Sequence, residues 1–154
     1  MIGDPALLAS EIAPAERNRY GIGVVPHWTD TELWPKEKAK YESWGWTDAV
    51  LIDVSEDPIA VCSMIGSCTR IVTSSLHGLI VSDAFGIPCR AEMYPAMLTN
   101  PQYESDYKWR DYAASIGSPM QWGEARTAPA AKIDAIKRDL FEEFGELLHV
   151  LPSS

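Results

Sequence analysis

The sequence predicts an α/β fold in three layers, a mostly parallel sheet with helices on both faces. Short apolar runs rich in β-branched residues alternate along the chain with segments of helical spacing, which is the order found in βαβ units. The strand candidates are apolar almost throughout, as expected for parallel strands covered on both faces. With 154 residues, 46% of them hydrophobic, the chain suits one domain with a core of its own.

Four strands are predicted, each bounded by turn or capping residues. Pro26 ends the first, and the second, AVLIDV, is the clearest because only its aspartate is polar. Residues 1–19 hold a Gly-Asp-Pro turn, a short apolar piece and a polar stretch, so we interpret them as a connector before a domain formed by residues 20–154. The strands are placed at 20–27, 49–54, 70–75 and 88–94, in a sheet of about four to six strands.

Helices are predicted between and after these strands. Ser55 or Asp57 can cap a helix that has Pro58 in its first turn, and Gly86 ends the next helix, with Pro88 just beyond it. A packed C-terminal helix is indicated by apolar residues three and four positions apart: Ile133, Ile136, Leu140, Phe144, Leu147 and Leu148. The helices are placed at 28–46, within 55–68, and at 76–86, 104–117 and 130–151.

The charge of the chain argues against polyanionic partners. It has 13 basic and 22 acidic residues, a formal net charge of −9, with the acidic residues spread along its length. Such a surface repels nucleic acid and anionic lipid, although a local cluster of cations and helix N-termini can still hold a small anion. No signal peptide and no apolar run of about 20 residues is present, so we expect a cytoplasmic protein without a membrane span.

Metal and nucleotide cofactors are not expected. Cys62, Cys68 and Cys89 are odd in number and lack C-x-x-C spacing, so they are interpreted as reduced thiols, mostly in the core. Three cysteines and three histidines at these spacings match no metal-ligand pattern, and no glycine-rich phosphate loop is present.

The stretch SSLHGLIVSDAFGIP, residues 74–88, places a histidine where a strand passes into a helix. In doubly wound folds ligands bind beyond the carboxyl ends of the strands, where His27, residues 53–55 and Glu92 are also expected. Serine hydroxyls, backbone N–H groups and a helix N-terminus together suit a phosphate or carboxylate. Alternatively, Ser74 or Ser75 caps the helix and His77 is only a hydrogen-bonded residue of its first turn.

This stretch closely resembles the Ser-x-Leu-His-Gly…Ala-x-Gly-Ile-Pro signature of polysaccharide pyruvyltransferases. Three further segments resemble the family's Gly-Asp-Pro, Pro-His and Lys-Phe-x-Asp-Tyr blocks in the same order: GDPALL (3–8), GIGVVPHWTD (21–30) and YKWRDYAASIG (107–117). Trp109 stands where the family usually has phenylalanine. Four blocks in order, covering nearly the whole chain, are a much stronger signal than any one of them.

The resemblance implies transfer of pyruvate from phosphoenolpyruvate to a sugar of a surface polysaccharide as a ketal, with no cofactor besides this donor. It also implies a Rossmann-like domain equivalent to the C-terminal half of a GT-B fold. The N-terminal half of the cleft is then missing from this sequence, so we expect either a separately encoded N-terminal half or a homodimer that covers the exposed wall of the cleft. Two rival functions remain open: the donor-binding half of a nucleotide-sugar glycosyltransferase, and a non-catalytic glycan- or anion-binding module.

Residue roles follow from the matched blocks. His77 is the candidate for acid/base work or phosphate contact, and Lys108 is the candidate anion clamp, with an exposed helix lysine as its alternative. His27 is either structural or directed at the acceptor. The remaining candidates for substrate binding are Ser74, Ser75 and Gly78.

Two other features are given less weight as site candidates. Packing is favoured over sugar stacking for the tryptophans at positions 28, 34, 44 and 46. Asp83 lies inside the helix after His77, so it is expected to be solvated or to cap the helix and not to pair with Asp53.

Overall fold

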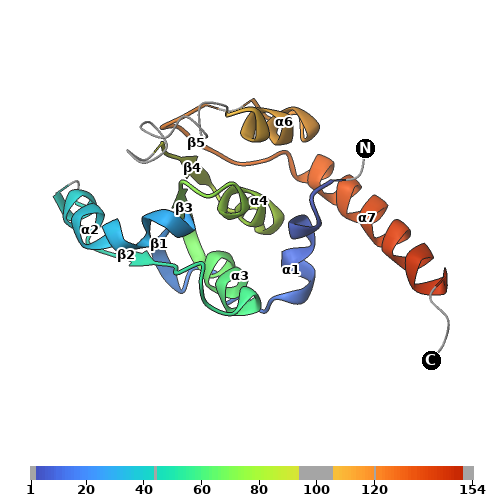
Figure 1. The fold of residues 1–154 in the computed structure, drawn as a ribbon, viewed down its shortest axis with the longest axis horizontal. Helices are drawn as coiled ribbons and strands as arrows, with labels where there is room; N and C mark the ends of the chain where they lie inside the picture. Colours follow the sequence, from blue (N-terminus) through green and yellow to red (C-terminus); the bar gives the residue numbers. More distant parts are fainter. Residues whose placement is uncertain (1–2, 44, 94–105, 120, 151–154) are drawn as a thin grey trace.

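The computed structural model describes residues 3–43, 45–93, 106–119 and 121–150, and it confirms the predicted α/β fold (Figure 1). Its sheet has five strands in the order β2-β1-β3-β4-β5. The first four strands are parallel, and the fifth pairs antiparallel with β4 at the edge. The strands are β1 (Tyr20–Val25), β2 (Ala49–Leu51), β3 (Cys68–Thr73), β4 (Cys89–Ala91) and β5 (Ala125–Arg126).

Helices form where capping residues and apolar spacing predicted them. Asp57 accepts a hydrogen bond from the backbone N–H of Ala60 (3.0 Å) and so caps the helix that begins at Pro58. Gly86 ends the helix of the SSLHG stretch in the left-handed conformation, with φ of 67°. The helical segments are η1 (Pro5–Leu8), α1 (Ala9–Ile12), η2 (Trp28–Leu33), α2 (Trp34–Ser43), α3 (Pro58–Gly66), α4 (Leu76–Phe85), α6 (Tyr107–Ser115) and α7 (Ala130–Val150).

Two hydrophobic clusters lie on opposite faces of the sheet. Ile22 and Val24 of β1 pack with Tyr41 of α2 in the smaller cluster. Val25, the next residue of β1, belongs to the larger cluster, which contains buried residues of α1, α3, α4, α6 and α7. Because successive side chains of a strand point to opposite faces, this division produces the predicted three layers.

The segment expected to be a connector packs onto the domain. Leu7 is fully buried in the larger cluster, and η1 and α1 lie against α4. Gly3 approaches α7 so closely that an added Cβ would lie 2.2 Å from Ile136. Residues 3–13 therefore contribute to the core, while the predicted domain boundary at residue 20 stays a prediction.

Several predicted elements differ at their ends. The predicted helix at 28–46 begins with the 3₁₀ turn η2, and β2 has three residues where six were expected. The two-residue strand β5 was not predicted, because AR carries no strand signal. Residues 94, 104 and 105, which the predictions included in a strand and a helix, lie outside the described residues, as do the side chains of Leu147 and Leu148.

Candidate active site

The strand order creates a crevice at the carboxyl ends of β1 and β3. The chain leaves β1 toward β2 on one side, and β3 lies on the other side of β1. In open parallel sheets this reversal of direction is where ligands bind. The loops that begin at Pro26 and Ser74 follow β1 and β3, so both border the crevice.

Buried hydroxyl groups join these two loops. Thr73 Oγ1 lies 2.8 Å from the carbonyl oxygen of Val25, to which it donates, and it accepts from the backbone N–H of Ser75 (2.9 Å). Ser74 Oγ accepts from the backbone N–H of His27 (2.8 Å). Thr73 and Ser74 are both buried. In this structure the Ser74 hydroxyl therefore holds the His27 loop in place, and its role in substrate binding stays a prediction.

Gly78 lets the first turn of α4 lie directly against the ends of these strands. An added Cβ at this position would lie 2.4 Å from Thr73 Oγ1 and 3.0 Å from Val25 Cγ1. Real Cβ atoms do not approach this closely, and Thr73 is held by its hydrogen bonds. The glycine after His77 is therefore explained by close packing between helix and strand.

The N-terminus of α4 has no side-chain cap. Ser75 occupies the N-cap position, with φ of −99° and ψ of 128°, but its side chain makes no capping hydrogen bond. Ser75 therefore does not cap the helix through its side chain, contrary to the alternative interpretation. The His77 side chain is 74% exposed, and its Nε2 lies 4.0 Å from Oδ2 of Asp4 in the Gly-Asp-Pro turn.

One cavity of about 630 Å³ is lined by all six residues given a catalytic or substrate-binding role, whereas Asp53, Ser55 and Glu92, which were also expected at this crevice, are not in its lining. His77 and Lys108 both line it, although they lie on different helices. Its apolar lining includes Val61, Cys62 and Ile65 of α3. The other predicted residues in the lining are His27, Ser74, Ser75 and Gly78.

Two exposed aromatic side chains lie in the same lining. Trp28 is 71% exposed and Tyr107 is 60% exposed. Packing, expected for the tryptophans, describes Trp46, which stacks on Tyr41 with ring centroids 5.6 Å apart. Trp28 also makes a ring contact, with its centroid 5.8 Å from that of His27, but most of its side chain stays exposed at the cavity. Trp44 and the side chain of Trp34 lie outside the described residues.

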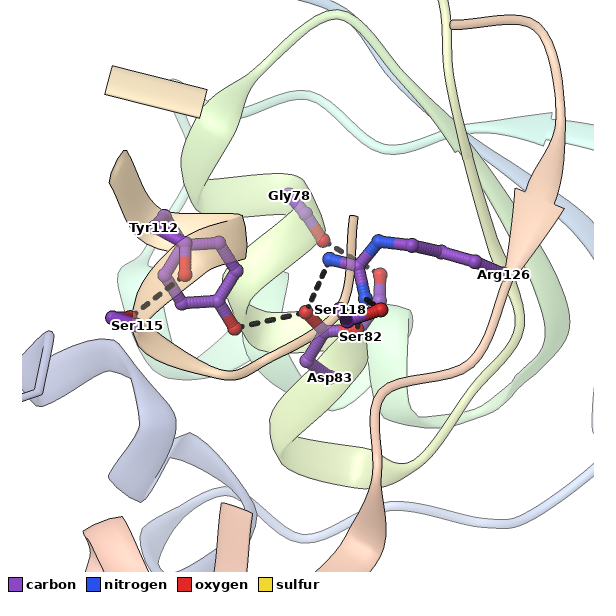
Figure 2. Close-up of polar contacts among 7 residues, drawn as sticks. All are labelled: Gly78, Ser82, Asp83, Tyr112, Ser115, Ser118 and Arg126. Carbon is purple, nitrogen blue, oxygen red and sulfur yellow. Dashed lines mark hydrogen bonds and ion pairs between the residues drawn. The ribbon is translucent and has the colours of Figure 1, made fainter. Parts of the chain in front are cut away.

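The expectation for Asp83 is wrong. Asp83 is neither solvated nor a cap, because it is buried and pairs with Arg126 of β5 (Nη2 to Oδ2, 2.8 Å; Figure 2). Tyr112 of α6 also donates to Oδ2 (2.8 Å). Burial raises the pKa of Asp83, while Arg126 and the Tyr112 hydroxyl act in the opposite direction. Sequence reasoning failed here because Asp83 finds its partners 29 and 43 residues away.

Other polar groups near the strand ends are engaged locally. Asp53 Oδ1 accepts hydrogen bonds from the backbone N–H and the hydroxyl of Ser55 (2.9 and 2.7 Å), and these bonds lower the pKa of Asp53. Glu92 forms an ion pair with Arg90. Within the described part of the chain, no group of three or more His, Cys, Asp and Glu residues could hold a metal ion, and no helix is long and apolar enough to span a membrane.

Sequence reasoning missed Asp4 and Tyr107 as parts of the site. Asp4 lies in a matched block and Tyr107 begins another, so the blocks were the signal that could have found them. The sequence contains no local sign that either residue lies beside His77 or the cavity. Only the packing of η1 and α6 around α4 shows this.

Comparisons with known proteins identify a family for this chain. The model of the family described as polysaccharide pyruvyl transferase matches residues 1–94, which include β1, β3, α3 and α4 but end before α6 and Lys108. "Uncharacterized protein L143" of Acanthamoeba polyphaga mimivirus is 31% identical over 121 residues, 75% of this chain and 40% of that protein. "Succinoglycan biosynthesis protein ExoV" of Rhizobium meliloti (strain 1021) is 31% identical over 121 residues, 74% of this chain and 34% of that protein. The chain thus spans less than half the length of these relatives, and no solved structure matches it.

Proposed function

Because the chain belongs to the polysaccharide pyruvyl transferase family, we propose that its cavity takes part in transferring pyruvate from phosphoenolpyruvate to a sugar of a polysaccharide. The observation that carries this proposal is the single cavity that joins His77, Lys108 and the uncapped N-terminus of α4. The name of the Rhizobium relative, a succinoglycan biosynthesis protein, supports a polysaccharide as the acceptor.

Lys108 and α4 are suited to hold the anionic groups of the donor. Phosphoenolpyruvate carries a phosphate and a carboxylate, and a lysine ammonium binds such groups as a point charge. The N-terminus of a helix adds unpaired N–H groups and a partial positive charge. The net charge of −9 does not prevent this, because distant surface charges are screened over about 8–10 Å at physiological salt.

The proposed reaction joins two sugar hydroxyls to C2 of the donor as a ketal. Two C–O bonds form at C2, the bond between C2 and the phosphate oxygen breaks, and the methylene carbon becomes a methyl group. One hydroxyl proton ends on this methyl group and the other leaves with phosphate, so the step needs no oxidant or reductant. His77 is exposed in the cavity and can carry one of these protons, since imidazole exchanges protons near neutral pH.

Trp28 and Tyr107 are suited to bind the acceptor. Exposed indole and phenol rings provide flat apolar faces on which a sugar ring can stack. Both rings line the cavity that contains His77, so a stacked sugar could bring its hydroxyls to the donor. The second half of the cleft, expected from the resemblance to GT-B enzymes, remains part of the proposal.

Isothermal titration with phosphoenolpyruvate tests the donor site. We expect binding by the wild type and an at least tenfold weaker affinity for Lys108→Ala, since a charge-assisted contact to phosphate contributes about 1.5–3 kcal/mol. Lys132→Ala, which removes an exposed lysine of α7, should bind as the wild type does. No binding by the wild type would contradict the proposal. Tighter binding of a nucleotide sugar than of phosphoenolpyruvate would favour the glycosyltransferase alternative.

His77 is tested by pyruvyl transfer and not by binding alone. With phosphoenolpyruvate and a glycan acceptor, His77→Gln should release phosphate at least 100-fold more slowly than the wild type, which is the low end for losing an acid/base group. The side chain is exposed, so the variant should keep its thermal stability. Transfer at the wild-type rate would remove His77 from the chemistry.

A further inference from the structure

Two helices have to be held at a fixed separation for the cavity to act as an anion site. Lys108 lies on α6, whereas His77 and the uncapped N–H groups belong to α4. The buried side chains of Trp109, Tyr112 and Ile116 attach α6 to the core. Apolar packing of this kind tolerates sliding and rotation more readily than a directional hydrogen bond does.

A buried hydrogen bond joins these two helices directly. The Tyr112 hydroxyl donates to Oδ2 of Asp83 at 2.8 Å, and both residues are buried. Tyr112 follows Lys108 by one helical turn on α6, and Asp83 lies on α4 (Figure 2). Burial and the neighbouring Asp83 raise the pKa of Tyr112, so its hydroxyl keeps the donated proton at neutral pH.

The acceptor of this bond is itself held in place. Arg126 of β5 contacts both oxygens of Asp83, Nη2 to Oδ2 at 2.8 Å and Nη1 to Oδ1 at 3.3 Å. The same guanidinium lies 3.3 Å from Ser118 Oγ, just after α6. A carboxylate held on both oxygens cannot follow α6 if that helix moves, so it is a fixed point for Tyr112.

We propose that the Asp83–Tyr112 bond positions Lys108 for the ligand of the cavity without either residue touching that ligand. The bond fixes α6 one turn from Lys108, and so it sets where the ammonium lies relative to the start of α4. This inference rests on the proposed function for its ligand. It assigns Tyr112 and Asp83 as positioning residues for donor binding.

The test is a double-mutant cycle with phosphoenolpyruvate, measured well below the unfolding temperature. Tyr112→Phe keeps the ring and the Asp83–Arg126 pair, and it should raise the Kd about three- to tenfold. Ile133→Val, a destabilising change at a buried position of α7, should leave the Kd within twofold. In the Lys108→Ala background, Tyr112→Phe should have no further effect, because the ammonium it positions is absent.

Hydrogen exchange supplies a readout that needs no ligand. Tyr112→Phe should speed amide exchange in α6 and leave α7 unchanged, whereas Ile133→Val should not speed exchange in α6. An unchanged Kd, an equal effect with and without Lys108, or unchanged exchange in α6 would overturn the inference. Failure of the wild type to bind phosphoenolpyruvate would instead contradict the proposed function, so the two failures are distinguishable.

Discussion

The two ends of α4 differ in whether side chains bind their backbone groups. At the C-terminal end, Lys137 Nζ donates to the carbonyl oxygen of Ala84 (3.0 Å) and Arg17 Nη2 to that of Phe85 (2.9 Å). At the N-terminal end, Ser75 supplies no side-chain cap and His77 is exposed in a cavity. One end of the helix is closed by cations from distant segments, and the other is left open.

The difference indicates which end of the helix is used. An α-helix leaves unpaired N–H groups at its start and unpaired carbonyls at its end, and buried ends are normally satisfied by other groups. Lys137 and Arg17 satisfy the carbonyls with the charge sign that the helix dipole favours. Residues 75–78 at the start of the helix line the same cavity as Lys108, where a bound anion could pair with N–H groups of the first turn. Under the proposed function, the C-terminal end of α4 anchors the helix and its N-terminal end binds the anionic donor.

Arg126→Met should have the largest effect on stability. It removes the partner of Asp83 in the anchored half of α4. It leaves the carboxylate of Asp83 buried without its cation, and breaking a buried ion pair costs roughly 3 kcal/mol or more in the free energy of unfolding. Chemical denaturation of wild type and variant measures this. The triple variant D83L/R126M/Y112F removes all three polar partners and should regain most of the loss. An equally unstable triple variant would show that packing, not the stranded charge, carries the effect.

Gly78 in the first turn of α4 and Gly86 at its C-cap allow a matched comparison of the two ends. Gly78→Ala forces a Cβ to within 2.4 Å of Thr73 Oγ1, so it should cost about 1–3 kcal/mol and also weaken phosphoenolpyruvate binding, because the start of α4 must move. Gly86→Ala strains a left-handed residue in open space, costs about 1 kcal/mol, and should leave binding unchanged. Equal effects of the two variants on the Kd would contradict the division between the ends.

Local signals predicted much of this helix from the sequence. Gly86 followed by Pro88 placed its end, and the step from TSS to LHG placed its start. The same holds for α3, where Asp57 and Pro58 mark the first turn. Signals of this kind depend on neighbours in the chain, so they can be read without knowing the fold.

Long-range partners could not be predicted in the same way. Asp83 was predicted to be solvated or a cap, because no neighbouring residue in the sequence indicates that Arg126 and Tyr112 form hydrogen bonds with it. The presence of α3 residues and Tyr107 in the lining of the cavity likewise depends on how the helices pack. The family blocks named His77, His27 and Lys108 without showing that they share one cavity.

The smallest effect concerns two buried thiols, Cys68 and Cys89, which begin β3 and β4. Burial raises the pKa of Cys68 to about 11 and of Cys89 to about 12, from an ordinary value of 9.0. The contribution of these two thiols to the free energy of unfolding is therefore fully present below pH 9. It is lost as the pH rises from 9 toward 11–12, because in that range the thiols ionise in the unfolded chain but not in the folded protein. The expected loss between pH 8 and pH 10 is about 1 kcal/mol per thiol.

Denaturation at several pH values, compared among variants, measures this loss. The double variant Cys68→Ala/Cys89→Ala should show a flatter decline above pH 8 than the wild type. Cys62, which is only half-buried in the cavity wall, should be alkylated before the other two. If the free energy of unfolding of the double variant declines with pH as steeply as that of the wild type, groups other than these two thiols cause the decline.

Amide chemical shifts test most directly whether the open end of α4 holds the donor. In a titration of the ¹⁵N-labelled protein with phosphoenolpyruvate, the amides of His77, Gly78 and Lys108 should shift together with a common Kd. Those of residues 83–86 at the anchored end should not move. Unchanged amide shifts for His77 and Gly78, or shifts confined to residues near Lys137, would show that the donor does not bind at the N-terminal end of α4.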